Sequence, residues 1–382
     1  MRLEKIFDFF ASLRLSVVVL TLALVLVFWG TWAQVDMGLY KAQNEFFRSF
    51  LVYWTPKGSS WKIPIFPGGY TIGFVFLFNL LAAQIKTFEL TVKKFGLILA
   101  HVGIILLLIG QLATDMLAIE SSMHLREGDT KNYTETDRRV ELAIVDATDA
   151  ERDRVTAISQ EALASEREIG DASLPFTIRI NKFYKNSAMT QRDPSSELQP
   201  PATQGFGPQV NVREVPAETE MEKRDMATVV IELVTPQGSL GTWIVSLWIG
   251  EEQHVHFENR EFHITLRPQR TYNDYSLHLL NFTHEVYPGT DIPKDFSSRV
   301  QVKNQKTGEE REVRIYMNNP LRYAGDTYYQ ASFDTDDKGT VLQVVRNPSW
   351  LTPYLACIMV GAGLVWQFLA HLIPFLKRKV AL

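Results

Sequence analysis

Four long stretches of this chain contain no Asp, Glu, Lys or Arg, and they limit its possible folds more than any other feature. They cover residues 15–33, 69–85, 95–114 and 350–375. A helix needs about 20 apolar residues to cross the hydrocarbon core of a membrane. The mean hydropathy of −0.06 resembles that of a soluble protein only because the middle of the chain is rich in charge. The sequence therefore predicts four transmembrane helices.

Two polar residues, Asn79 and Gln84, fall inside the second and shortest stretch. Neutral amides are tolerated in a membrane helix when a neighbouring helix supplies a hydrogen-bond partner. We therefore expect both side chains to contact another helix rather than lipid.

Three clusters of basic residues set the expected topology. They precede the first helix, join the second to the third, and follow the fourth: Arg2, Lys5 and Arg14; Lys86, Lys93 and Lys94; and Lys377, Arg378 and Lys379. Basic residues near helix ends favour the cytoplasm. The prediction is a bacterial inner-membrane protein with both termini, the loop 86–94 and the tail 376–382 in the cytoplasm. Residues 34–68 then form an outer loop and residues 115–349 an extracytoplasmic, or periplasmic, domain.

Residues 1–14 combine apolar and basic residues and suit a short amphipathic helix in the membrane surface. The first apolar stretch is longer than the core of a signal peptide. Trp29 and Trp32 occupy positions where cleavage requires small residues. We therefore expect an anchor that is not cleaved.

The outer domain is expected to be all-β. Apolar and polar residues alternate, as in strands, over residues 140–145, 176–183, 228–233, 242–249, 262–266 and 341–345. Turn residues at 235–239 and 304–309 predict two hairpins. The fold class is therefore a membrane α-helical bundle with a sandwich-like or open-barrel β domain. Residues 147–223 break the pattern and suggest an irregular insertion, with one helix at 147–173 and a loop at 185–223.

Composition excludes several kinds of chemistry. The only cysteine, Cys357, lies in the fourth apolar stretch, so disulfides within the chain, CxxC redox motifs and CxxCH haem attachment are absent. A net charge of −4 argues against a nucleic-acid partner. No hydrolase triad or phosphate-binding glycine loop is present, so we predict no catalytic residue.

His101 is the main candidate for chemistry. It lies about 9 Å along the third helix at 1.5 Å per residue, a depth at which ionisable residues are usually functional. Gly96, Gly103 and Gly110 form a small-residue seam on another face of the same helix. Two interpretations stay open: His101 binds haem iron, or it is a neutral histidine hydrogen-bonded to a neighbouring helix.

The other histidines carry weaker signals. His371 shares the cytoplasmic half of the membrane with His101, so it is an alternative haem ligand or an interfacial residue. His254 and His256 would lie on one face of a strand. No third ligand accompanies them at an established metal-site spacing, so we predict no metal site beyond haem iron.

Several segments resemble the ResB (also called CcsB) proteins of System II cytochrome c maturation. They are FASLRL at 10–15, WGTWAQ at 29–34, HVGI at 101–104, YPGTDIPKDFSS at 287–298 and NPLRYAGDTYYQASF at 319–333. The order of three helices, an outer domain and a fourth helix is similar too. The resemblance extends over the chain except for residues 147–223.

The resemblance implies a role in carrying haem b across the membrane and attaching it to apocytochrome c. A ResC/CcsA-type membrane partner carries the tryptophan-rich haem motif, which is absent here, and the pathway's thiol-reducing factors supply reduced cysteines. By the same resemblance His101 is a transient haem ligand in a cytochrome c synthetase (haem lyase) complex, of which this chain would be an unfused, non-catalytic subunit. Partner or client contacts are expected at Asn319, Pro320, Tyr323, Gly325, Tyr329, Gln330 and Phe333.

Two alternatives remain from the sequence. A membrane-anchored sensor or binding module would use the β domain to recognise a ligand without haem. A b-type cytochrome would hold haem between His101 and His371.

Overall fold

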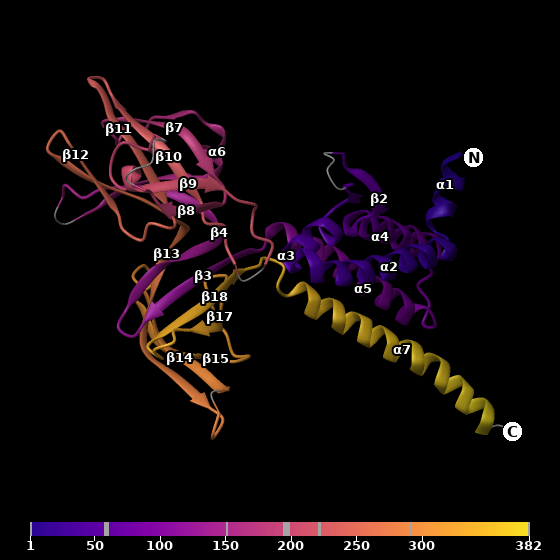
Figure 1. Ribbon diagram of the computed structural model, residues 1–382. Coiled ribbons are helices and arrows are strands. Elements are labelled where there is room, and N and C mark those ends of the chain that lie inside the picture. The colour runs from indigo at the N-terminus through magenta and orange to yellow at the C-terminus, as the bar shows by residue number, and fades with distance from the viewer. Residues whose placement is uncertain are drawn as a thin grey trace. The chain divides into compact units, whose positions relative to one another are not determined.

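The computed structural model describes residues 2–56, 61–149, 152–193, 199–220, 223–290 and 292–380. The chain divides into two compact units (Figure 1). A helical unit contains Met1–Ile119, Thr219–Met221 and Arg346–Leu382. A β-rich unit contains Glu120–Glu218 and Glu222–Val345.

Four helices of the helical unit are long and apolar enough to cross a membrane. They are α2 (Leu13–Met37), α4 (Gly69–Lys86), α5 (Phe95–Leu117) and α7 (Thr352–Val380). Each contains or overlaps one of the four predicted stretches. A short helix, α1 (Arg2–Phe10), precedes α2, and the Ser12 hydroxyl caps α2 by accepting a hydrogen bond from the Leu15 amide.

The predicted outer loop is ordered where it is described. It contains α3 (Leu39–Ala42), the π-helix η1 (Gln43–Phe47) and the hairpin β1 (Leu51–Trp54) with β2 (Ile63–Pro67). Gly30 of α2 lets η1 approach, because a Cβ there would lie 2.6 Å from the Phe47 ring.

Asn79 fixes α4 against the junction of α1 and α2. Its side chain is fully buried. The amide nitrogen donates to the carbonyl oxygens of Phe10 (2.6 Å) and Ser12 (3.2 Å), and the amide oxygen accepts from the Ser16 hydroxyl (2.6 Å). The expectation that this amide finds a partner on another helix is confirmed.

The β-rich unit has one large sheet and two smaller ones. The strands are β3 (Ile119–Arg126), β4 (Thr130–Asp146), β5 (Arg154–Ser159), β6 (Glu168–Ile169), β7 (Thr177–Tyr184), β8 (Ser187–Gln191), β9 (Val210–Glu214), β10 (Thr228–Thr235), β11 (Gly238–Ser246), β12 (Gln253–Phe257), β13 (Arg260–Val286), β14 (Pro293–Asn304), β15 (Glu309–Tyr316), β16 (Leu321–Tyr323), β17 (Asp326–Phe333) and β18 (Gly339–Arg346). The large sheet runs β15-β14-β13-β4-β3-β18-β17-β16, with β12 and β5 beside β13 and β4. A four-stranded sheet runs β11-β10-β7-β6, and β8 pairs with β9.

All six segments predicted as strands contain strand, and both predicted turns join hairpins, β10–β11 and β14–β15. The 27-residue strand β13 is much longer than its predicted segment. Its first part belongs to a core with Ile144, Ile178 and Ile231, and its second part to a core with Leu125 and Tyr328. Two cores therefore share one strand, and a sandwich-like packing of the sheets stays a prediction.

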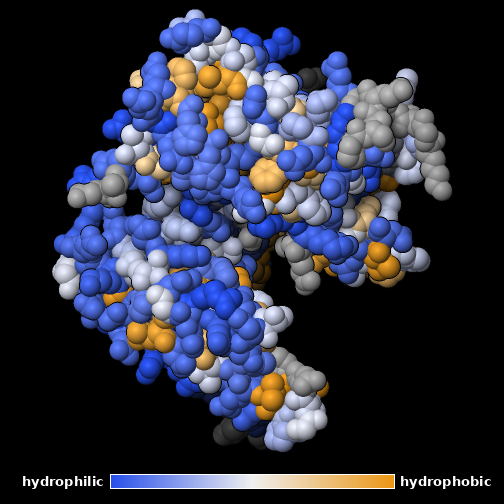
Figure 2. Space-filling model, turned by 60° about the vertical axis from the view of Figure 1, so that its left-hand side comes forward, coloured by the Kyte–Doolittle hydropathy of each residue, from blue (hydrophilic) through white to orange (hydrophobic). Residues whose placement is uncertain are grey.

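The segment 147–223 is more regular than expected. Instead of one helix, its first part contains β5, the six-residue helix α6 (Gln160–Ser165) and β6. Instead of a loop, its second part contains the paired strands β8 and β9. The prediction failed because these strands are short and carry polar residues, so the apolar alternation is weak. In Figure 2, hydrophilic residues cover most of the visible face of the β-rich unit.

Candidate functional site

The glycine seam of α5 packs against α7. A Cβ at Gly96 would lie 2.5 Å from the Gly363 carbonyl oxygen, and one at Gly103 would lie 2.9 Å from the Ala356 carbonyl oxygen. A Cβ at Gly110 would instead meet the side chain of Thr352. Because backbone atoms of α7 lie this close to Gly96 and Gly103, only glycine at those two positions allows the antiparallel helices to approach so closely. The predicted seam is confirmed, and its partner is the fourth apolar helix.

His101 lies on another face of α5, toward α4. Its Nδ1 is 3.2 Å from the side-chain oxygen of Gln84, and the ring is half-buried. An amide oxygen only accepts hydrogen bonds, so Nδ1 carries the hydrogen and Nε2 keeps its lone pair. No hydrogen bond involves Nε2 among the residues that the structure describes. The imidazole is thus held as the tautomer in which Nε2 can bind a metal.

The same face of α5 borders a cavity of about 590 Å³. Asp115 lies on the same face of α5, about four turns beyond His101. It binds Arg48 (Nε to Oδ1, 2.6 Å) and accepts a hydrogen bond from the Tyr70 hydroxyl. The Asp115 side chain is only 12% exposed. The remaining walls are mainly apolar: Leu39, Gln43, Phe47, Gly69, Gly73, Phe74, Leu77, Leu108, Gln111 and Leu112. The cavity therefore has an apolar body with one ionic end.

His371 lies near the end of α7, and its Nδ1 is 2.8 Å from the Gln367 carbonyl oxygen. Gly96 contacts Gly363 and Gln367, which fixes the register of the antiparallel pair. At 1.5 Å per residue, this register places His101 and His371 about 14–20 Å apart along the helix axes. One iron cannot bind both at that separation, so His371 does not pair with His101 in this arrangement.

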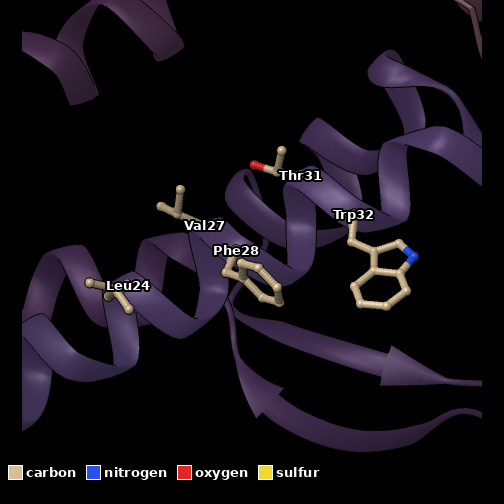
Figure 3. Close-up of a pocket in the computed structure, with 5 residues that line it drawn as sticks. All are labelled: Leu24, Val27, Phe28, Thr31 and Trp32. Atoms are coloured by element: carbon tan, nitrogen blue, oxygen red, sulfur yellow. The ribbon is translucent and has the colours of Figure 1, made fainter.

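A shallow hollow on α2 is lined by Leu24, Val27, Phe28, Thr31 and Trp32 (Figure 3). Leu24, Val27, Phe28 and Trp32 are exposed. The residues all come from one helix and include a single hydroxyl, whereas ligand sites need several converging polar groups. This surface has the composition expected of a membrane helix that faces lipid.

The segment 319–333 forms the hairpin β16–β17. Ala324 (φ 49°) and Gly325 (φ 88°) have positive φ values, as the two-residue turns of tight hairpins require. Behind the hairpin, the Tyr275 hydroxyl donates to Asp326 (2.8 Å) and lies 2.7 Å from the Tyr328 hydroxyl. Burial, with Tyr328 and Asp326 beside it, raises the pKa of Tyr275. Much of this segment therefore has a structural role.

The seven predicted contact residues divide into two groups. Asn319, Gly325 and Tyr329 are exposed and available to a partner. Pro320, Tyr323, Gln330 and Phe333 are half-buried, and three of these have partners within the unit. Tyr323 binds Glu309, Gln330 binds Ser298 and Thr340, and the Phe333 ring packs on Phe282, His284 and Phe296.

For Gln84, the sequence predicted the kind of contact but not the partner. Its amide was expected to contact another helix, and it does. Its pairing with His101 was not predicted, because the register between α4 and α5 depends on the loop that joins them. A polar residue in each of two consecutive membrane helices was the available signal.

A known protein family matches the part of the chain that contains the hairpin β16–β17. Residues 226–349 match the model of the ResB-like family, a region from β10 to β18 that does not include His101. Protein NrfI of Wolinella succinogenes is 29% identical over 119 residues. The aligned region covers 31% of this chain and only 13% of that protein. Over residues 226–349 the chain is therefore similar to proteins of the ResB-like family.

Proposed function

We propose that this chain is a membrane component of cytochrome c biogenesis that handles haem together with a ResC/CcsA-type membrane protein. The match of residues 226–349 to the ResB-like family model and the four membrane-length helices support the general role. The single observation that carries the haem proposal is His101, held by Gln84 with Nε2 open, in an apolar helix.

The proposed orientation follows the basic clusters at the helix ends. Residues that precede α2, join α4 to α5 and follow α7 lie in the cytoplasm, and the β-rich unit lies outside. In this orientation, His101 lies in the cytoplasmic half of the membrane and the ionic end of the cavity near the outer surface. Both lie on one face of α5.

The donor set of this site fits haem. Haem, when bound, would supply an iron that accepts a neutral imidazole nitrogen, and His101 would be the residue that holds it. A ligating histidine usually donates its other ring N–H to an oxygen, which fixes the ring orientation, and Gln84 supplies that oxygen. His101 therefore needs no change of tautomer to act as a ligand.

Any second protein ligand of the haem iron would come from the partner protein. His371 lies too far along the helix axes to serve, and the remaining histidines of the chain lie in the β-rich unit. A site completed by a second protein makes haem binding depend on assembly.

The β-rich unit serves as the surface that positions apocytochrome c. Tyr329 and Asn319 are exposed on or beside the hairpin β16–β17 and are available to a client peptide. The unit contains no cysteine, so reduction of the client's CxxCH thiols falls to other factors of the pathway.

Haem spectra of the purified chain, alone and with its partner, test the proposal. We expect haem in the complex, its loss in His101→Ala, and its retention in the matched control His371→Ala. Free imidazole should restore the spectrum of His101→Gly, because the ligand atom is then supplied from solution.

Three outcomes would contradict the proposal. Haem that survives His101→Ala in the complex removes His101 as a ligand. Haem held by the isolated chain and lost in His371→Ala favours a b-type cytochrome. Haem absent from both preparations favours a sensor or binding module.

A further inference from the structure

The hairpin β12–β13 collects three histidines and a glutamate on one face. The antiparallel register pairs His254 with His263 and His256 with Glu261. Alternate residues on the same strands, Val255, Phe262 and Ile264, are buried in the core. All four polar residues therefore point away from the core.

Three of these side chains place their ligand atoms at metal-site distances. His254 Nδ1 is 3.1 Å and His263 Nε2 is 3.3 Å from the same oxygen of Glu261. All three ligand atoms lie within 4.8 Å of one another. In a tetrahedral zinc site with bonds of about 2.0–2.1 Å, neighbouring ligand atoms are about 3.3 Å apart. Two of the three edges already have nearly this length.

His263 lies between two carboxylates. Its Nδ1 is 3.1 Å from Glu252 and its Nε2 is 3.3 Å from Glu261. A neutral imidazole has one N–H, so it can donate to only one of them. The other nitrogen then faces a carboxylate with its lone pair, unless the ring gains a proton or a cation binds between them. With Nδ1 donating to Glu252, Nε2 is the free ligand atom, as in carboxylate–histidine–zinc sites.

We propose that His254, Glu261 and His263 bind one divalent transition-metal ion, with Glu252 as the residue that orients His263. Imidazole and carboxylate ligands suit Zn²⁺, Cu²⁺ and Ni²⁺, whereas Mg²⁺ and Ca²⁺ require oxygen ligands alone. The side chains of His254 and Glu261 are 53% and 43% exposed. The site is thus open on its outer side, where water, His256 or a group from a partner completes the coordination.

Sequence spacing alone did not indicate this site. His254 and His256 were seen as a pair, but His263 and Glu261 join them only through the cross-strand register. Val255 and Phe262 bury the opposite face and hold that register. The arrangement is independent of His101 and of the proposed role in haem handling.

Zinc binding by the full chain tests the proposal. The chain is purified in detergent without a polyhistidine tag, stripped of metal with a chelator, and titrated with Zn²⁺ against a chromophoric competitor. We expect one specific equivalent of Zn²⁺, with the affinity reduced at least 10-fold in His254→Ala and in His263→Ala. Glu252→Ala keeps all three ligands but removes the oxygen that orients His263, and it is expected to weaken binding about 10-fold.

His278→Ala is the matched control. His278 also lies on β13, but its Nδ1 binds the Thr130 hydroxyl outside the cluster. Circular dichroism of each variant establishes that the strands remain folded. Co²⁺ should give the visible absorption of a tetrahedral site in the native chain and in His278→Ala.

Failure of the native chain to compete for Zn²⁺ would overturn the proposal. The same holds if the folded double variant His254→Ala/His263→Ala binds Zn²⁺ as tightly as the native chain. Equal loss of affinity in His278→Ala would show that the effect is not specific to this cluster. Displacement of Zn²⁺ by Ca²⁺ would contradict the proposal that histidine nitrogens bind the metal ion.

Discussion

The two faces of α5 make different kinds of contact with neighbouring helices. Toward α7 the helix presents glycines, and contact is made by backbone atoms that leave no space for a side chain. Toward α4 it presents His101, which contacts that helix by one hydrogen bond to Gln84. The first face gives a rigid pair of helices, whereas the second leaves a ligand atom unused. The packing face and the face proposed to bind haem therefore lie on different sides of one helix.

Substitution in the seam should have the largest effect. In Gly103→Leu the new side chain meets the Ala356 and Val360 backbone, which cannot yield without separating α5 from α7. We expect loss of folded protein in detergent, measured by size-exclusion chromatography and thermal unfolding. The matched control is Gly361→Leu on α7, where a Cβ meets no atom within 4 Å. Equal behaviour of the two variants would contradict the role of the seam.

Loss of the buried amide of α4 should come next. Asn79→Leu leaves the Ser16 hydroxyl and the carbonyl oxygens of Phe10 and Ser12 without their partner. We expect a loss of about 1–3 kcal/mol in the free energy of unfolding, measured by denaturant titration in micelles. The control is the same change at Gln84 on the same helix. A native unfolding midpoint for Asn79→Leu would remove the structural role of this amide.

The Gln84→Leu variant should affect cargo more than fold. Without the amide oxygen the His101 ring loses its orientation but keeps both nitrogens. We expect about a 10-fold lower haem affinity of the complex and a shifted haem absorption spectrum. Gln84→Glu keeps an accepting oxygen and should retain most of the affinity. Unchanged spectra in Gln84→Leu would mean that the hydrogen bond does not position the ligand.

Replacing His101 should have the smallest effect on stability. His101→Ala removes one interhelical hydrogen bond, and such bonds contribute about 0.6 kcal/mol on average in membrane proteins. The unfolding midpoint should therefore change little while haem is lost. A loss of stability as large as that of Asn79→Leu would show that His101 has a structural role. It would contradict the distinction between a packing face and a ligand-binding face of α5.

The sequence predicted the helices and the seam because both depend on local pattern. Runs without charge gave the four helices, and the seven-residue spacing of Gly96, Gly103 and Gly110 gave the packing face. The same local reasoning located six strands and two turns. It did not predict β8 and β9, whose short strands carry polar residues.

Pairings between distant residues were beyond that reasoning. The Gln84–His101 contact depends on how α4 and α5 slide past each other, and the His254–Glu261–His263 cluster depends on strand register. Neither the register between the two helices nor the register between the two strands can be derived from the spacing of apolar residues in the sequence. The buried contacts of Asp326 and Tyr328 were also missed, because an exposed and a buried tyrosine look alike in a strand that alternates.

The order of strands in the large sheet determines how late in synthesis β3 can gain its second neighbour. β3 lies beside β18, although more than 200 residues separate them in the chain. Pairing of such distant segments is slow, since a long loop must close first. During synthesis β3 keeps an open edge until the ribosome has produced almost the whole chain. Nascent chains of this protein are thus vulnerable to edge-to-edge aggregation for most of their synthesis, and chaperones would have to protect the open edge.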